Sequence, residues 1–283
     1  MRKSLKAVLA NRLEPPQLKL LYKSYDIVGD IAIIRIPETL KQYSDDIAEA
    51  IMQTHKHIKT VLRQVSPVTS DYRLRELELV TGERKTETIH KEYDCIFKVD
   101  LKRCYFSPRL VYERMRIAQQ IQLGETVVNM FAGVGCYSII IAKHSKPGRI
   151  YSIDINPIAI RYMGENVKLN KVGGLVVSFQ GDAKTVVEEK LRNIADRVLM
   201  PLPEKAYKYL DHAVLTLKPT GGWIHYYDFE HAEKGENPIE KVKARVAKRL
   251  QDFGVVFETP FRRIVRTTGP RWYQIALDIR IIP

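Results

Sequence analysis

Cysteine and long apolar runs are both scarce in this sequence of 283 residues. Its three cysteines, Cys95, Cys104 and Cys136, are too scattered for a disulfide framework and lack the paired spacing of a zinc site. No stretch approaches the ~20 apolar residues that a membrane-spanning helix needs. The apolar run near the N-terminus, Ala7 to Ala10, is too short for a secretory leader. The sequence therefore predicts a cytoplasmic protein that needs no metal and no membrane.

Acidic residues are outnumbered, with 33 Asp and Glu against 46 Lys and Arg, which gives a net charge of +13. A positive field of this kind favours a polyanionic partner such as a nucleic acid. A basic surface covered only by solvent would give the same composition. Charge alone leaves both interpretations open.

The residues before about 105 predict a short N-terminal segment and a small α+β domain. Residues 1–22 are basic and helical in pattern, and residues 23–104 form the predicted domain. Residues 25–37 read as two short strands joined by a Gly-Asp turn, and 44–57 have helical spacing. Two further strand-like runs cover 76–80 and 87–99.

Strands and helices alternate in residues 105–283. Strands are expected at 126–130, 148–154, 175–179, 196–200 and 222–227, and helices at 109–121, 137–142 and 157–170. This alternation predicts an α/β fold with a doubly wound, Rossmann-like parallel sheet.

A glycine-rich turn follows the first of these strands and includes Gly133 and Gly135. Glycines allow a sharp turn and a close approach to a ligand at the carboxyl end of the strand. Asp154 and Asp182 end the next two strands, where a carboxylate can bind a ribose diol or an adenine amino group. Ser138 stands where the dinucleotide fingerprint has its third glycine, which argues against NAD. Both aspartates could instead only cap the helices that follow them.

Three phrases of the sequence resemble a known family: Tyr105 to Arg114, Asn129 to Gly135 and Asp196 to Pro203. Residues 71–78 and 221–227 add to the likeness. The family is that of the archaeal and eukaryotic tRNA (guanine-37 N1)-methyltransferases and their relatives in wyosine biosynthesis. The resemblance implies a class I methyltransferase that uses S-adenosylmethionine and acts in the anticodon loop of tRNA, with tRNA-Phe among its substrates, as a monomer.

The resemblance also implies roles for three residues. Glu113 is the base that takes the guanine N1 proton, and Arg73 stabilises the negative charge that then develops on O6. Arg109 orients Glu113 or contacts a phosphate. Either arginine could instead belong to a structural salt bridge. The residues implied at the cofactor are Arg114, Phe131, Gly133, Gly135, Asp154, Ile155, Asp182, Ala183 and Pro201.

Two departures from the family pattern stand out. Pro201 replaces an asparagine after the fourth strand of the parallel sheet, so the pocket loses a side-chain donor and acceptor. A less polar pocket suits the tricyclic precursor imidazo-guanosine, and methylation of its carbon 7 is a possible second activity. The chain also has only about 22 residues before the matching region, where many members carry a tRNA-gripping domain. The tRNA phosphates would then be bound by the small domain, by residues 241–245 and by Arg262, Arg263 and Arg266.

Three alternatives remain at this stage. An aminocarboxypropyl transferase of wyosine biosynthesis shares the fold and the glycine turn. A non-catalytic RNA-binding module is a second alternative, although Gly133, Gly135, Asp154 and Asp182 are all retained. An NAD-dependent dehydrogenase is the third, and it lacks a convincing catalytic arrangement.

Overall fold

The computed structural model describes residues 5–22, 24–69 and 71–283. The chain divides into two compact units, Met1–Val111 and Tyr112–Pro283. The sequence placed this boundary after residue 104. Within the described residues no helix is long and apolar enough to cross a membrane.

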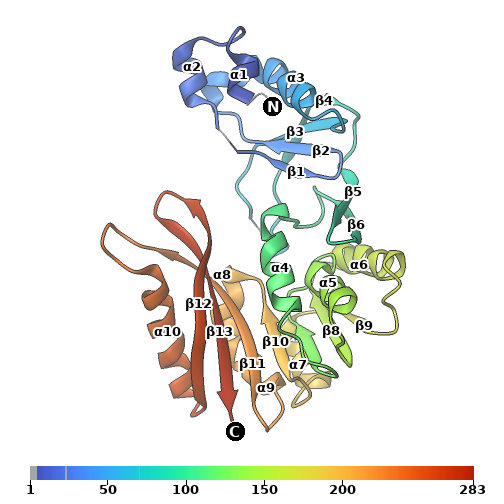
Figure 1. Cartoon of the computed structure of the whole chain (residues 1–283), viewed down its shortest axis with the longest axis vertical. Helices are drawn as coiled ribbons and strands as arrows, with labels where there is room; N and C mark the ends of the chain where they lie inside the picture. The colour runs from blue at the N-terminus through green and yellow to red at the C-terminus, as the bar shows by residue number, and fades with distance from the viewer. Residues whose placement is uncertain (1–4, 23, 70) are drawn as a thin grey trace. The chain divides into compact units, whose positions relative to one another are not determined.

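The first unit is built on a four-stranded sheet with the order β1-β2-β3-β4 (Figure 1). The predicted Gly-Asp turn joins β1 and β2 as expected, with Gly29 at a φ of +56°. The sequence missed β3, which pairs parallel to β2 and antiparallel to β4. The strands are β1 Asp26–Val28, β2 Ile31–Ile34, β3 Thr60–Gln64 and β4 Leu77–Gly82.

The N-terminal segment forms two helices, α1 Leu5–Leu9 and α2 Pro15–Leu20. Leu5, Leu9, Leu13 and Leu21 are buried in one core with the apolar face of helix α3, Ser44–Thr54. Hydrophobic burial therefore ties the segment to the sheet.

The strand-like run from 87 to 99 is a hairpin. Its strands are β5 Glu87–Glu92 and β6 Cys95–Asp100. Tyr93 and Asp94 between them have φ values of +47° and +54°. Two consecutive left-handed residues form the type of tight turn that suits the twist of a hairpin. Such a turn without glycine gave no sequence signal.

The second unit has a seven-stranded sheet with the order β12-β13-β11-β10-β7-β8-β9. The five strands from β11 to β9 are parallel, which confirms the predicted fold class, and β13 and β12 add an antiparallel edge. The strands are β7 Thr126–Asn129, β8 Arg149–Asp154, β9 Val176–Gln180, β10 Arg197–Met200, β11 Gly222–His231, β12 Val256–Gly269 and β13 Trp272–Ile282.

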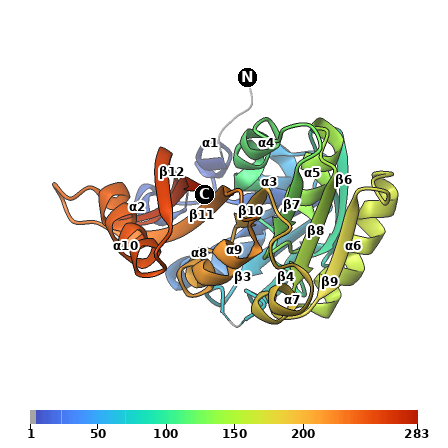
Figure 2. The ribbon, with the colours of Figure 1, turned by 90° about the horizontal axis from the view of Figure 1, so that it is seen from below.

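Helices cover both faces of this sheet (Figure 2). Alternate strand residues such as Val128, Val198 and Ile224 pack in one core with α7, α9 and α10, while α5 and α6 lie on the other side of the strands. The helices are α4 Val111–Ala118, α5 Cys136–His144, α6 Pro157–Leu169, α7 Ala183–Lys190, α8 Pro203–Ala206, α9 Leu210–Thr216 and α10 Pro238–Asp252.

We expect Gly135→Ala to lower the free energy of unfolding by about 2–4 kcal/mol, because a left-handed backbone conformation and a steric overlap of the new Cβ both cost free energy. Gly135 has a φ of +92°, and a Cβ there would lie 2.8 Å from Met163 Cγ. Gly124→Ala is the matched control, since Gly124 has a φ of +80° and a Cβ added there would meet no atom within 4 Å. Urea denaturation measures both variants, and equal losses would show that the contact with Met163 contributes nothing.

Candidate active site

The glycine turn between β7 and α5 is tied to the end of β8. The backbone N–H of Gly133 donates to Asp154 Oδ2 at 2.6 Å, and that of Asn156 donates to Asp154 Oδ1 at 2.9 Å. Gly133 and Gly135 both have positive φ, as the close approach requires. Burial raises the pKa of Asp154, and the two backbone hydrogen bonds act in the opposite direction.

The fixed carboxylate of Asp154 suits a ribose diol. Each of its oxygens accepts one backbone hydrogen bond and keeps a further lone pair for a ligand hydroxyl. Asp154 does not cap α6, because Asn156 accepts from the N–H of Ile158 and is the N-cap. The neighbouring Ile155 is 37% exposed and offers an apolar surface to a nucleobase.

Asp182 lies at the end of the next strand and does cap a helix. Its Oδ1 accepts from the N–H of Lys184 at 2.8 Å, where buried Ala183 begins α7, and its Oδ2 accepts from Tyr209 Oη at 2.5 Å. The ring of Tyr209 meets that of Phe131 edge to face, with centroids 5.2 Å apart. The glycine turn, two carboxylates and an aromatic pair thus fit a nucleoside cofactor.

Ser138 fills the place of the missing third glycine. Its hydroxyl accepts from Asn129 Nδ2 at 3.2 Å and from Ser152 Oγ at 2.7 Å, and all three side chains are fully buried. These bonds pin α5 to β7 and β8. Asn166 supports the turn from α6, because its Nδ2 donates to the carbonyl of Val134 at 3.0 Å.

Glu113 on α4 is only 2% exposed and is held from one side. Its Oε1 accepts from Arg116 Nη2 at 2.6 Å, from Arg116 Nε at 3.0 Å and from Tyr227 Oη at 2.8 Å. Its Oε2 accepts no hydrogen bond from the residues that the structure describes, and Arg263 Nη1 lies 3.9 Å away. One oxygen is therefore anchored and the other is available as an acceptor.

Arg116 is shared with a second buried carboxylate. Its Nη1 and Nη2 donate to the two oxygens of Asp278 at 2.6 and 3.0 Å. Although burial acts to raise the pKa of Asp278, the bonds from His225 and Arg116 hold it below its usual range.

His225 continues the network to a further ion pair. Burial lowers its pKa, so its Nδ1–H donates to Asp278 at 2.7 Å and its Nε2 accepts from Arg197 Nη1 at 2.7 Å. Arg197 in turn binds both oxygens of Glu125 at 2.9 Å.

Glu113 also lies close to the glycine turn. Tyr137, in the first turn of α5, has its ring 6.3 Å from that of Tyr227, which donates to Glu113. Burial first, and then the charge of Glu113, raise the pKa of Tyr137, while the charge of buried Arg114 lowers it. The predicted base and the predicted cofactor turn are therefore parts of one site in the second unit.

Other predicted residues occupy different places. The guanidinium of Arg73 stacks on the ring of Tyr105 at 4.0 Å, and Arg73 has a φ of +55°. Arg109 donates through Nε to Asp26 Oδ1 at 2.7 Å within the first unit. Arg116, which the sequence did not suggest, orients Glu113 in place of Arg109. A phosphate contact by Arg109 stays a prediction. Pro201 is half-buried and lies just after β10.

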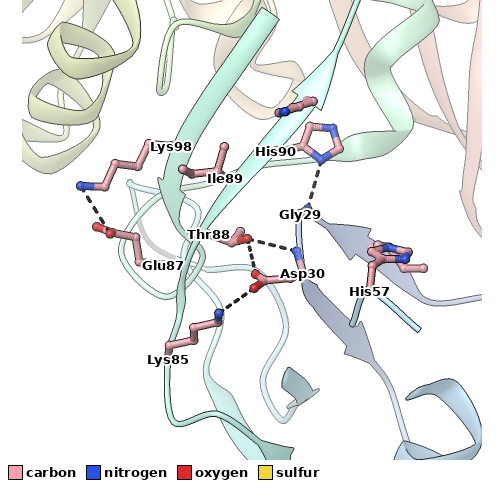
Figure 3. A pocket seen from close by; sticks show the side chains of 11 residues that line it. Gly29, Asp30, His57, Lys85, Glu87, Thr88, Ile89, His90 and Lys98 are labelled. Atoms are coloured by element: carbon pink, nitrogen blue, oxygen red, sulfur yellow. Dashed lines mark hydrogen bonds and ion pairs between the residues drawn. The ribbon is translucent and has the colours of Figure 1, made fainter. Parts of the chain in front are cut away.

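A pocket of about 790 Å³ lies in the first unit, beside the β1–β2 turn and the β5–β6 hairpin (Figure 3). Lys85 Nζ donates to Asp30 at 2.6 Å, and Lys98 lies 3.4 Å from Glu87. Lys91 also lines the pocket. The residues predicted for the active site do not line it.

Family models match nearly the whole chain. The TRM5/TYW2 methyltransferase domain matches residues 88–256, and the TYW2 N-terminal domain matches residues 5–86. The chain belongs to the TRM5/TYW2 methyltransferase family. The resemblance read from the sequence motifs is thereby confirmed.

Three relatives span the reactions of this family. The chain is 44% identical to tRNA (guanine(37)-N(1))-methyltransferase Trm5b of Pyrococcus abyssi, over 94% of this chain and 78% of that protein. It is 37% identical to tRNA 4-demethylwyosine(37)-methyltransferase Taw21 of Saccharolobus solfataricus, over 92% and 94%. It is 35% identical to a tRNA(Phe) (4-demethylwyosine(37)-C(7)) aminocarboxypropyltransferase of Methanocaldococcus jannaschii, over 90% and 97%.

Two solved structures agree with this assignment. Trm5b from P. abyssi superposes with a TM-score of 0.87 at 41% identity, over 100% of this chain and 82% of that chain. TYW2 of M. jannaschii, solved in complex with AdoMet, superposes with a TM-score of 0.65 at 30% identity, over 92% and 99%.

We expect the stability of the protein to fall between pH 7 and pH 5, and His225→Asn to reduce that fall. The folded-state pKa of His225 is lowered from its ordinary 6.5, so the unfolded chain binds more protons below that pH. This contribution to stability is complete above about pH 6.5 and is lost at up to about 1.4 kcal/mol per pH unit below it. Asparagine keeps a donor for Asp278 and does not titrate.

Urea denaturation at pH 7 and pH 5 tests this expectation. The control is His57→Asn, because His57 is exposed. If His225→Asn and His57→Asn show the same pH dependence as the unaltered protein, the buried histidine is not its source.

Proposed function

We propose that this chain transfers a methyl group from S-adenosylmethionine to N1 of guanosine at position 37 of tRNA, and that it acts as a monomer. The observation that carries the proposal is the hydrogen bonding of Glu113. Its Oε1 accepts from Arg116 and Tyr227, and its Oε2 remains available to accept a proton. Guanine N1 is protonated at neutral pH and needs a base before it can attack.

S-adenosylmethionine supplies an activated methyl group. Residues of the second unit fit its nucleoside: Asp154 for the ribose hydroxyls, Ile155 and Phe131 for the base, and Asp182 for the adenine amino group. Gly133 and Gly135 leave room for the methionine part. Arg114 is buried on α4, where its charge acts on Tyr137, and Ala183 is buried next to Asp182 at the start of α7.

Glu113 can receive a proton on Oε2 although an arginine binds it, because the hydrogen bonds from Arg116 and Tyr227 all go to Oε1. The N1 proton of guanine moves to Oε2 of Glu113, and the electron pair of the N–H bond stays on the guanine ring.

Pro201 favours a second substrate, the tricyclic 4-demethylwyosine base. Where the family pattern has an asparagine, the proline removes a side-chain donor and acceptor, which suits a larger and less polar base. The relative Taw21 of S. solfataricus, which is 37% identical to this chain, is a 4-demethylwyosine methyltransferase and supports the same idea. Aminocarboxypropyl transfer is the remaining candidate, on the strength of the M. jannaschii relative.

The net charge of +13 supports tRNA as the partner. The name of the M. jannaschii aminocarboxypropyltransferase includes tRNA(Phe), which supports tRNA-Phe among the substrates. The basic run at 241–245 contributes less than the sequence suggested. Lys241 pairs with Glu236 at 3.1 Å, and Arg245 pairs with Asp228 and Glu230 at 2.8 Å each. The first unit, which includes Arg109 and Lys91, remains the better candidate for phosphate contacts.

The proposal is tested by incubating the protein with methyl-labelled S-adenosylmethionine and two tRNA substrates. One carries guanosine at position 37 and the other carries 4-demethylwyosine. Mass spectrometry of the nucleosides then identifies the product. 1-Methylguanosine from the first substrate supports the proposal, and a methylated tricycle from the second adds the Taw21 activity. A product that carries the aminocarboxypropyl group, or no product, contradicts it.

We expect Glu113→Gln to slow single-turnover methylation of guanosine about 10²- to 10⁴-fold, because glutamine keeps the shape and cannot take a proton. Its dissociation constant for S-adenosylmethionine should stay the same. Asp154→Ala is the converse variant and should weaken cofactor binding about 10- to 100-fold, since it removes hydrogen bonds to a charged group. Calorimetry and quenched-flow assays separate the two. Full activity of Glu113→Gln would remove Glu113 as the base.

A further inference from the structure

The register of the C-terminal strands aligns two rows of side chains on one face of the sheet. His225, Asp278 and Phe261 are cross-strand partners on β11, β13 and β12. The next row on the same face is Tyr227, Ala276 and Arg263. Figure 1 shows these three strands side by side at the C-terminal edge of the sheet.

These rows form the surroundings of Glu113. Tyr227 donates to Glu113 from one end of the second row, and Arg263 approaches Glu113 Oε2 from the other end. Between them in the register stands Ala276, which is buried. In the first row Asp278 holds Arg116, and Phe261 lies under the Arg116 guanidinium at 4.4 Å.

Irregular pairing on both sides of residues 261–264 changes the direction of this part of β12. The register shifts between Glu258 and Phe261, next to Pro260, and again between Ile264 and Arg266. Bulges of this kind bend a strand and redirect its side chains.

The arginines beside Arg263 are engaged elsewhere. Arg262, on the opposite face, pairs with Glu240 of α10 at 3.2 Å, and Arg266 donates to Gln274 at 2.7 Å. The side chain of Arg263 is 42% exposed, so a substrate can reach it beside the carboxylate.

Glu113 and Arg263 together match one edge of guanine. That edge presents the N1–H donor next to the O6 acceptor. The protein presents the reverse, with the acceptor Oε2 next to the donor Nη1, and the two atoms are 3.9 Å apart. A base that donates N1–H to Glu113 would therefore bring its O6 to the guanidinium of Arg263.

We propose that Arg263 is a further catalytic residue, which donates a hydrogen bond to O6 of the target guanine. When the N1 proton passes to Glu113 Oε2, the electron pair left on the base spreads to O6. A guanidinium at O6 stabilises this charge as it develops. The family resemblance implied Arg73 for this role. The proposal rests on guanosine methylation as the proposed function.

The test compares Arg263→Ala with Arg280→Ala on tRNA that carries guanosine at position 37. Arg280 is an exposed arginine on β13 of the same sheet and controls for the loss of one positive charge. We expect Arg263→Ala to reduce the single-turnover rate about 10- to 100-fold. The dissociation constants for tRNA and for S-adenosylmethionine should change less than about threefold, and Arg280→Ala should keep the full rate.

A phosphate contact would give the opposite pattern. The rate at saturating tRNA would be unchanged and tRNA affinity would fall. The slope of the logarithm of the binding constant against the logarithm of the salt concentration would become smaller by about one. That result overturns the proposal, as does equal behaviour of Arg263→Ala and Arg280→Ala. If the unaltered protein makes no 1-methylguanosine, the proposed function fails instead, so the two failures are distinct.

Substitution of the substrate atom provides a second measurement. 6-Thioguanosine at position 37 replaces O6 with sulfur, a weaker acceptor. We expect it to slow the unaltered protein and Arg280→Ala, and to slow Arg263→Ala much less, because the hydrogen bond is already absent there. Equal slowing of all three proteins contradicts a contact between Arg263 and O6.

Discussion

One arginine held between two buried carboxylates organises the candidate active site. Arg116 binds Glu113 and Asp278, and each of the three side chains would be poorly solvated without the others. The hydrogen bonds of this arrangement orient Glu113 by one oxygen only. Neutral His225 then links Asp278 to the Arg197–Glu125 pair without adding charge. The position of the Glu113 carboxylate thus depends on contacts that extend across three strands.

The cofactor half of the site depends on local backbone geometry. Gly133 and Asp154 are joined by a single hydrogen bond across neighbouring parallel strands, and Asn166, Ser138 and Asn129 fix the same turn from behind. These contacts involve main-chain groups and short polar side chains, which hold one geometry with little conformational freedom. The two halves meet through Tyr137 and Tyr227, so the position of Glu113 is linked to the position of the glycine turn.

Sequence patterns were sufficient for the glycine turn, Asp154, Asp182 and five parallel strands, because each has a local signal: a buried run, a strand end or a turn residue. They were insufficient for Arg116 as the partner of Asp278, since 162 residues separate the two and no short-range pattern connects them. They also missed β12, where Pro260 and several arginines interrupt the alternation of apolar and polar residues. Asp182 caps α7, as one of the two interpretations of the sequence had it, and a carboxylate that caps a helix still retains lone pairs for a ligand.

The small side chain of Ala276 has an evolutionary consequence. Residue 276 makes no bond to a reacting group, yet it is the shared register partner of Tyr227 and Arg263, the two residues that contact Glu113 from the sheet. Because Ala276 is buried, a larger aliphatic side chain there would have to displace a neighbour. Divergence among related enzymes, from one modified base to another, can therefore begin at a buried position such as 276 and does not require a change at a residue that touches the substrate.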